Sequence, residues 1–156
     1  MKIAVIGYPG SGKRKLADQI EGKYYCAKLC LDDIDFPGET RERNIELTRE
    51  LLNGFMEENI SWVIEGDDFE VLFDERMDVA DKIVIMKYNR FLCLFKMVKG
   101  HLERHQKVDG ELISWILFGS RTSERRAQYN RIMRQYSEKV ILLFNPAQLF
   151  MLKDLI

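Results

Sequence analysis

A chain of 156 residues, 46% of them hydrophobic, is long enough to form one domain with a buried core. A net charge of −1 disfavours a protein that grips DNA along a broad basic face, and three cysteines disfavour a disulfide framework. No apolar run approaches the roughly 20 residues that cross a bilayer, and the opening MKIAVIG is too short for a signal peptide. We therefore expect a cytoplasmic protein without membrane contact.

The predicted elements alternate between short apolar strands and helices. The first strand, residues 2–6, is rich in β-branched residues and ends at a glycine loop that leads into a helix. Further strands are expected at 27–31, 61–65, 82–87 and 139–144, and further helices after residue 40 and at 69–79, 90–103 and 123–136. This alternation predicts an α/β fold in a single domain, with a parallel sheet covered by helices on both faces.

Caps and apolar spacing mark the ends and inner faces of these helices. Gly22 is expected to end the first helix, Thr40 to begin the second, and Asn145-Pro146 to begin a closing helix. The expected core positions are Ile45, Thr48, Leu52, Phe55 and Met56 on the second helix, and Phe91, Leu94, Phe95 and Val98 on the helix at 90–103. Each set follows the helical repeat, so we expect it to face the sheet.

The segment GYPGSGK, residues 7–13, has the spacing of a phosphate-binding loop. Glycines permit the backbone angles and the close approach that such a loop needs, and the amides at a helix start favour an anion. Gly7, Gly12 and Lys13 stand at the required positions between the first strand and the first helix. We therefore expect this segment to bind the phosphates of a nucleotide.

The residues after Lys13 depart from that motif. A Ser or Thr usually follows the lysine and gives its hydroxyl oxygen to magnesium, whereas Arg14 and Lys15 stand here. Arginine has no acceptor atom, so it cannot bind a cation, but its charge can replace part of the metal's neutralisation of phosphate. Ser11 precedes the lysine, where we expect it to face the wrong phosphates. We predict nucleotide binding that is largely independent of magnesium, unless Arg14 simply points to solvent.

Acidic residues follow the second and third expected strands, at the edge of a parallel sheet where ligands gather. We favour functional roles for Asp32 and Glu65, which come at the ends of apolar strands. Either carboxylate could accept a proton from a substrate hydroxyl or hold a metal-bound water. Solvation and helix capping explain Asp33, Asp67 and Asp68 more simply.

An arginine-rich stretch, GSRTSERRAQY, carries Arg121, Arg125 and Arg126. Guanidinium groups suit phosphate oxygens, although a charged helix face explains them equally well. Residues 32–81 hold 17 acidic and 4 basic residues, a net charge of −13, whereas residues 99–139 hold 9 basic and 5 acidic ones, a net charge of +4. Any anion site is therefore local. The aromatic residues expected in the core nearby are Trp115, Phe118 and Tyr129.

Five segments together resemble one family. MKIAVIGYPGSGK, LCLDDIDF, WVIEGD, YNRFLCLFK and WILFGSRTSERRAQY follow one another as in the bacterial DNA topology modulation (FlaR-type) proteins, which are similar to adenylate-kinase-related P-loop kinases. The resemblance covers nearly the whole chain. It implies a P-loop NTPase fold with strand order 2-3-1-4-5 and an arginine-bearing lid around residues 100–126. It also implies ATP, or another nucleoside triphosphate, at the loop from Pro9 to Lys13, and adenine near Asn145.

The sequence thus leads to a hypothesis of an ATP-binding kinase-like protein with a modified loop. Lys13 would bind the β- and γ-phosphates, Asp32 would act as base or hold a metal-bound water, and Arg121 and Arg125 would stabilise the transferring group. The residues expected to line the nucleotide are Gly7, Pro9, Gly10, Ser11, Gly12, Lys13, Arg14, Lys15 and Asn145. Magnesium is expected for activity but weakly held, through water on Asp32 or Glu65.

Two questions stay open from the sequence. A nucleotide acceptor would need an arginine for its phosphate, and Arg41, Arg43 or Arg90 could serve. An alcohol would need a carboxylate base instead, and Asp32 or the pair of Asp33 and Asp35 could serve. The rival hypothesis is a non-catalytic nucleotide-binding regulator that acts through DNA or a protein partner. Its support is the missing loop hydroxyl and the basic segment at 121–134, and the acidic middle of the chain makes direct DNA binding the less favoured route.

Overall fold

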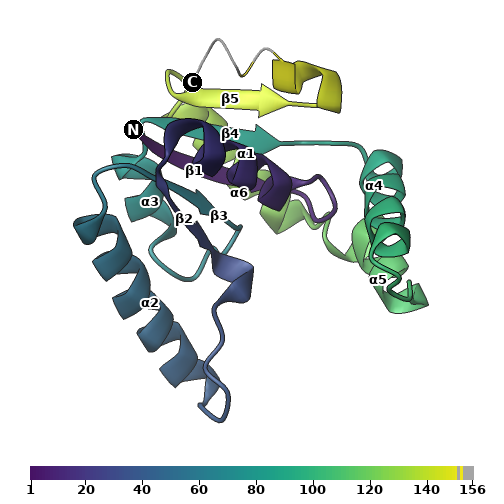
Figure 1. Cartoon of the computed structure of the whole chain (residues 1–156), viewed down its shortest axis with the longest axis horizontal. Coiled ribbons are helices and arrows are strands. Elements are labelled where there is room, and N and C mark those ends of the chain that lie inside the picture. Colours follow the sequence, from purple (N-terminus) through teal and green to yellow (C-terminus); the bar gives the residue numbers. More distant parts are fainter. Residues whose placement is uncertain (151, 153–156) are drawn as a thin grey trace. The chain divides into compact units, whose positions relative to one another are not determined.

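A computed structural model describes residues 1–150 and 152 and contains a five-stranded parallel sheet in the order β2-β3-β1-β4-β5 (Figure 1). The strands are β1 (Lys2–Gly7), β2 (Ala27–Cys30), β3 (Trp62–Glu65), β4 (Lys82–Met86) and β5 (Val140–Leu143). They lie within a residue or two of the five expected positions. The α/β fold class, the parallel sheet and its strand order are confirmed.

The internal contacts divide the chain into two compact units. Unit 1 comprises residues 1–6 and 14–83, and unit 2 comprises residues 7–13 and 84–156. Unit 1 therefore holds β2, β3 and residues 2–6 of β1, whereas unit 2 holds the glycine loop, residues 84–86 of β4, and β5. Each unit is described by itself below.

The pairing within unit 1 places the ends of its strands in register. Val5 of β1 lies opposite Glu65 of β3, and Glu65 in turn lies opposite Cys30 of β2. Every residue of β3 is buried, as are residues 3–7 of β1, because the apolar side chains of these strands form the core. The carboxyl ends of three strands therefore carry the loop, the acidic segment after β2 and Glu65.

The helices of unit 1 are α1 (Lys13–Tyr24), α2 (Arg41–Glu58) and α3 (Phe73–Val79). The Thr40 side chain accepts a hydrogen bond from the Arg43 N–H, so the expected cap of α2 is confirmed. Leu52 is fully buried, in the middle of the expected inner face. The expectation for Gly22 is wrong, because α1 continues past it and the left-handed residue at its end is Tyr25, with φ 50°.

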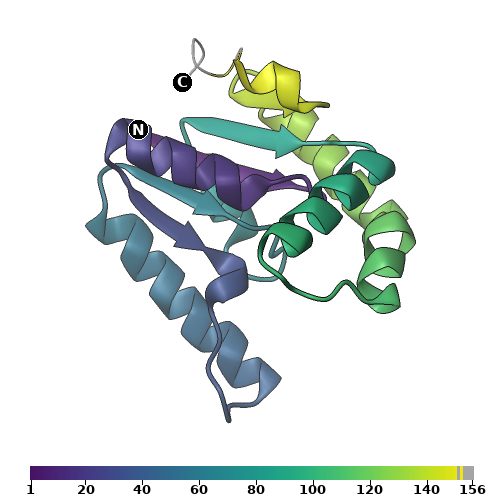
Figure 2. The ribbon, with the colours of Figure 1, turned by 45° about the vertical axis from the view of Figure 1, so that its right-hand side comes forward.

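The helices of unit 2 are α4 (Arg90–Glu103), α5 (Gly110–Ser114) and α6 (Ser123–Gln135), with a π-helical turn at Trp115–Gly119 and a 3₁₀ turn at Pro146–Gln148. The π-helical turn packs against both α4 and α5, as the two views show (Figures 1 and 2). Asn89, Asp109, Thr122 and Asn145 cap α4, α5, α6 and the 3₁₀ turn through their side chains.

Two expectations about the core of unit 2 are wrong. Phe91 and Phe95 are 72% and 65% exposed, and the buried residue on α4 is Cys93. The buried face of α4 is thus not the expected one. The helix packs against the glycine loop with the face that carries Cys93. Trp115 and Phe118 are also exposed, whereas Tyr129 is buried as expected. Within residues 1–150 and 152, no helix is long and apolar enough to cross a membrane.

Candidate functional site

The glycine loop joins the end of β1 to the start of α1, which is the setting that a phosphate-binding loop requires. Gly10 and Gly12 have φ values of 78° and 96°, which side-chain-bearing residues rarely adopt. A Cβ on Gly10 would lie 2.7 Å from the carbonyl oxygen of Cys93. The backbone of α4 therefore packs directly on the loop, and only glycine fits between them.

Two polar side chains of the loop are positioned for an anion. The Lys13 ammonium donates a hydrogen bond to the Gly7 carbonyl oxygen at 3.0 Å, across the mouth of the loop. Ser11 is fully buried, and its hydroxyl has no hydrogen-bond partner within residues 1–150 and 152. A buried hydroxyl without a partner is costly, and a phosphate oxygen would satisfy it. Which phosphates of a nucleotide the Ser11 hydroxyl would face stays a prediction.

A second lysine reaches the loop from α4. The Lys96 ammonium donates a hydrogen bond to the Ser11 carbonyl oxygen at 2.8 Å and lies 4.9 Å from the centre of the Tyr88 ring. Burial raises the pKa of the neighbouring Cys93 thiol, and the charges of Arg121, Lys13 and Lys96 act against that shift. The charges of three cations thus act on one buried thiol of α4, and Arg121 contacts its sulfur directly at 3.5 Å. The sequence pattern of α4 gave no indication of Lys96.

Arg121 is held behind the loop. Its guanidinium group stacks on the Tyr8 ring at 4.0 Å and donates a hydrogen bond to the Tyr88 carbonyl oxygen at 2.8 Å. Tyr8 is buried and meets the Tyr129 ring edge-on, at 5.4 Å between centroids. In this arrangement Arg121 supports the loop from one side. A role in stabilising a transferring group stays a prediction.

The residue after the loop lysine forms an ion pair in unit 1. Arg14 lies 2.5 Å from a carboxylate oxygen of Asp33, and both side chains are more than half exposed. Arg14 therefore does not simply point to solvent. Asp33, for which we expected only solvation or helix capping, forms an ion pair with Arg14. Asp32 and Asp35, on either side of Asp33, are exposed. The pair places a positive charge and a neutralising carboxylate where related loops carry a hydroxyl.

Glu65 lies deep at the end of β3, with 2% of its surface exposed. Burial raises the pKa of the Cys30 thiol opposite it, and the charge of Glu65 acts in the same direction. The segment that follows Glu65 is bound by Arg76, which is fully buried. The Arg76 guanidinium donates hydrogen bonds to the carbonyl oxygens of Gly66 and Asp68 at 3.2 and 2.6 Å. Burial lowers the pKa of Arg76 to about 10. Arg76 therefore fixes the backbone that follows Glu65.

The three arginines expected to hold an acceptor phosphate have other partners. Arg41 forms an ion pair with Glu70 at 2.7 Å, and Arg43 forms one with Glu46 at 2.6 Å. Arg90 lies over the Phe118 ring, 5.6 Å from its centre. Each of these contacts would have to be given up or shared before the arginine met a phosphate.

The remaining expected residues have local roles in the fold. The Arg125 N–H donates a hydrogen bond to the Thr122 hydroxyl in the first turn of α6. The Asn145 side chain accepts a hydrogen bond from the Gln148 N–H, and the Gln148 side chain accepts one from the Asn145 N–H. Lys15 is exposed on α1. Roles for Arg125, Asn145 and Lys15 in nucleotide binding stay predictions.

The donor set of the loop suits a polyphosphate better than it suits a directly bound metal ion. Among the residues described, no group of three or more His, Cys, Asp or Glu side chains could hold a metal. Arg14 offers no acceptor, so a loop-bound magnesium would lack its usual protein ligand. Binding of magnesium through water on Asp32 or Glu65 stays a prediction. The donors of the loop, Lys13 and Ser11, thus fit a polyphosphate such as that of ATP.

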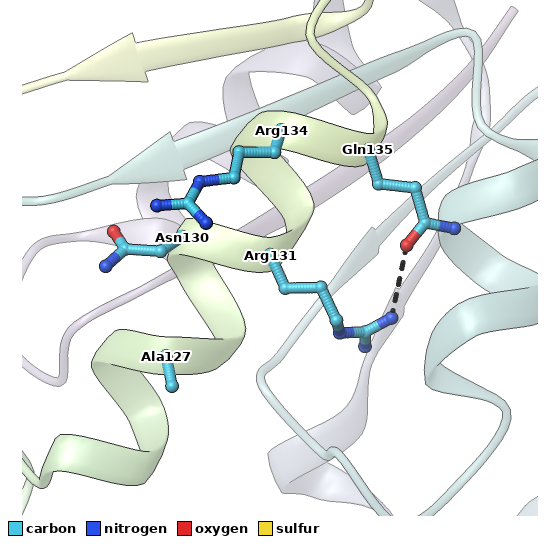
Figure 3. A pocket seen from close by; sticks show the side chains of 5 residues that line it. All are labelled: Ala127, Asn130, Arg131, Arg134 and Gln135. Atoms are coloured by element: carbon cyan, nitrogen blue, oxygen red, sulfur yellow. Dashed lines mark hydrogen bonds between the residues drawn. The ribbon is translucent and has the colours of Figure 1, made fainter.

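A separate basic hollow of about 530 Å³ lies on α6 (Figure 3). Arg131 donates hydrogen bonds to the side-chain oxygens of Gln128 and Gln135, and Asn130 and Arg134 lie beside each other along the same hollow (Figure 3). The residues that line the hollow are Ala127, Asn130, Arg131, Arg134 and Gln135.

Comparison with known proteins finds solved structures with a similar fold. No protein-family model matches the sequence, and no curated protein matches it. The structure is similar to a shikimate kinase from Bacteroides thetaiotaomicron (TM-score 0.56, 20% identity, 93% of this chain and 85% of that chain). It is also similar to a gluconokinase from Sinorhizobium meliloti (TM-score 0.54, 12% identity, 90% of this chain and 80% of that chain). The chain has the P-loop kinase fold. At these identities the likeness shows the fold alone, so the resemblance to topology modulation proteins stays a prediction.

Proposed function

We propose that this P-loop kinase fold binds ATP at the loop of residues 7–13 and transfers its γ-phosphoryl group to a small hydroxyl-bearing acceptor. The observation that carries the proposal is the loop itself. It has left-handed glycines packed on α4, a lysine across its mouth, and a buried serine hydroxyl without a partner within the described chain. These features together match what a polyphosphate needs from a loop at a helix start.

The transfer itself needs a base, a bound phosphate and charge stabilisation. The acceptor oxygen forms a bond to the γ-phosphorus, the bond from that phosphorus to the bridging oxygen of ADP breaks, and the acceptor proton goes to a carboxylate. Asp32 is our candidate for that base. The Lys13 ammonium would neutralise part of the negative charge on the phosphates. When bound, magnesium would neutralise phosphate charge, and we assign it to water-mediated contacts with Asp32 or Glu65.

A hydroxyl acceptor is favoured over a nucleotide acceptor. A nucleotide acceptor would need a cation for its own phosphate, but Arg41 and Arg43 are held by Glu70 and Glu46. The segments after β2 and β3 offer carboxylates instead, which suit a proton-accepting role. The acceptor is therefore proposed to be a small alcohol that carries no phosphate.

Calorimetric titration with ATP, followed by a panel of phosphoryl acceptors, tests this proposal. We expect ATP to bind, and ADP to form only when alcohols are added. Formation of ADP with nucleoside monophosphates, and not with alcohols, would contradict the choice of acceptor. No binding of ATP would contradict the proposal as a whole.

A non-catalytic nucleotide-binding regulator is the second candidate. It is favoured by Arg14, which replaces the metal-binding hydroxyl, and by the basic hollow on α6. Such a regulator should bind duplex DNA with an affinity that falls steeply with salt, because phosphate contacts release counterions. Measuring DNA binding at two salt concentrations, beside the acceptor panel, separates the two candidates.

A further inference from the structure

We infer that Lys96 is a positioning residue of the phosphate loop, and that its charge lets the loop bind polyphosphate without magnesium. The inference rests on the proposed nucleotide binding and adds to it the residue that takes over part of the metal's role. From the sequence, that role fell to Arg14. In the structure Arg14 is paired with Asp33, which neutralises it.

The position of Lys96 depends on the absence of a side chain at Gly12. The ammonium donates a hydrogen bond to the Ser11 carbonyl oxygen at 2.8 Å, and a Cβ on Gly12 would lie 2.8 Å from the same nitrogen. The ammonium thus occupies the space that a side chain would fill. It lies against the single peptide unit that joins Ser11 to Gly12.

That peptide unit connects the ammonium to a bound anion. The carbonyl and the N–H of a trans peptide point in opposite directions, so the Gly12 N–H points away from Lys96. A cation on the carbonyl oxygen polarises the peptide and strengthens its N–H as a donor. Lys96 therefore acts through the Ser11–Gly12 peptide and need not touch the ligand.

The surroundings of Lys96 add a long-range effect. Lys13 and Lys96 both donate hydrogen bonds to carbonyl oxygens of the loop, and the Arg121 guanidinium lies 3.5 Å from the buried Cys93 sulfur, so three positive charges lie at or behind the loop in unit 2. Like charges around one loop repel one another, and a polyphosphate beside the loop would relieve that repulsion. Metal-free ATP carries roughly twice the net negative charge of its magnesium complex, so it should depend on Lys96 more strongly.

The experiment measures the Kd of ATP by calorimetry, in EDTA and in magnesium, for the wild type and four variants. Lys96→Met removes the charge and the hydrogen bond, Lys96→Gln keeps a donor without charge, and Lys96→Arg keeps both. Lys99→Met is the matched control, because Lys99 lies one turn along α4, is mostly exposed and faces Glu103 at 3.9 Å. Tripolyphosphate serves as a second probe, because it carries the phosphates without the base.

We expect Lys96→Met and Lys96→Gln to weaken metal-free ATP roughly tenfold or more, the order expected for a charge-assisted contact. They should weaken magnesium-ATP less, so that the ratio of the two Kd values rises, and tripolyphosphate should follow ATP. Lys96→Arg and Lys99→Met should stay within about twofold of the wild type.

Four results would overturn the inference. Equal losses with and without magnesium would make Lys96 a structural anchor only, and a loss seen with ATP but not with tripolyphosphate would place its effect at the base. Unchanged Kd values in Lys96→Met would exclude any role of Lys96 in ATP binding. The wild-type titration would still support the proposed function in that case. If the wild type binds no ATP at all, the proposed function fails and this inference fails with it.

Discussion

The packing of the loop on α4 predicts that Gly10→Ala destabilises the protein and disables the loop together. Alanine at φ 78° costs about 1–2 kcal/mol, because its Cβ crowds the following carbonyl. The same Cβ would lie 2.7 Å from the Cys93 carbonyl oxygen, which belongs to a helix backbone and cannot rotate away. Relieving such a contact costs about 1–3 kcal/mol. We therefore expect a loss of roughly 2–5 kcal/mol in the free energy of unfolding.

Urea unfolding of Gly10→Ala and the wild type measures that loss, with Gly22→Ala as the matched control. Gly22 lies within α1, is exposed, and a Cβ there would meet nothing within 4 Å. Gly22→Ala should therefore stabilise the protein by about 0.5–1 kcal/mol, as in any exposed helix. Because relieving the clash moves the loop, ATP affinity of Gly10→Ala should fall at least roughly tenfold. A variant that unfolds within about 0.5 kcal/mol of the wild type and binds ATP equally well would refute the described packing.

Three further predictions follow from single side chains. Ser11→Ala should leave stability unchanged or raise it by about 1 kcal/mol, since it removes a buried hydroxyl, while it weakens ATP binding several-fold; equal ATP affinity would show that the hydroxyl does not meet the phosphates. Burial raises the pKa of Tyr88 to about 12, above its ordinary value of 10.0, so the stability that its protonated form contributes is present below pH 10 and lost as pH rises through about 12. In Tyr88→Phe the free energy of unfolding in urea should therefore fall less steeply between pH 9 and 12 than in the wild type. The same slope in both proteins would contradict this prediction. Arg14→Ser, which restores a hydroxyl and breaks the ion pair with Asp33, should make magnesium strengthen ATP binding more than it does in the wild type; an unchanged ratio of Kd values would mean that Arg14 has no part in metal dependence.

The sheet and its order could be predicted because apolar strands and glycine loops leave strong local signals. The strands at 2–6 and 82–87 are nearly continuous apolar runs, and capping residues such as Thr40 mark helix starts. The exact end of α1 could not be predicted from Gly22, because a helix also ends where packing stops and a residue such as Tyr25 can adopt the left-handed conformation.

The loop could also be predicted, but the residues that surround it could not. Periodicity on α4 favoured Phe91 and Phe95 as inner residues, whereas the helix turns Cys93 and Lys96 to the loop. That rotation is set by backbone contact with Gly10, which no local pattern contains. Arg76 was missed for a similar reason. A buried arginine that binds main-chain carbonyls has the same sequence signature as one on the surface.

The central claim is that the loop at residues 7–13 binds the phosphates of a nucleotide. Calorimetric titration of ATP into the wild type and Lys13→Ala tests it most directly, because Lys13 lies across the mouth of the loop and binds the Gly7 carbonyl oxygen. We predict that the wild type binds ATP in EDTA as well as in magnesium, and that Lys13→Ala weakens binding at least roughly tenfold in both. A Kd for Lys13→Ala within twofold of the wild type, or a wild type that binds no ATP, would contradict the claim.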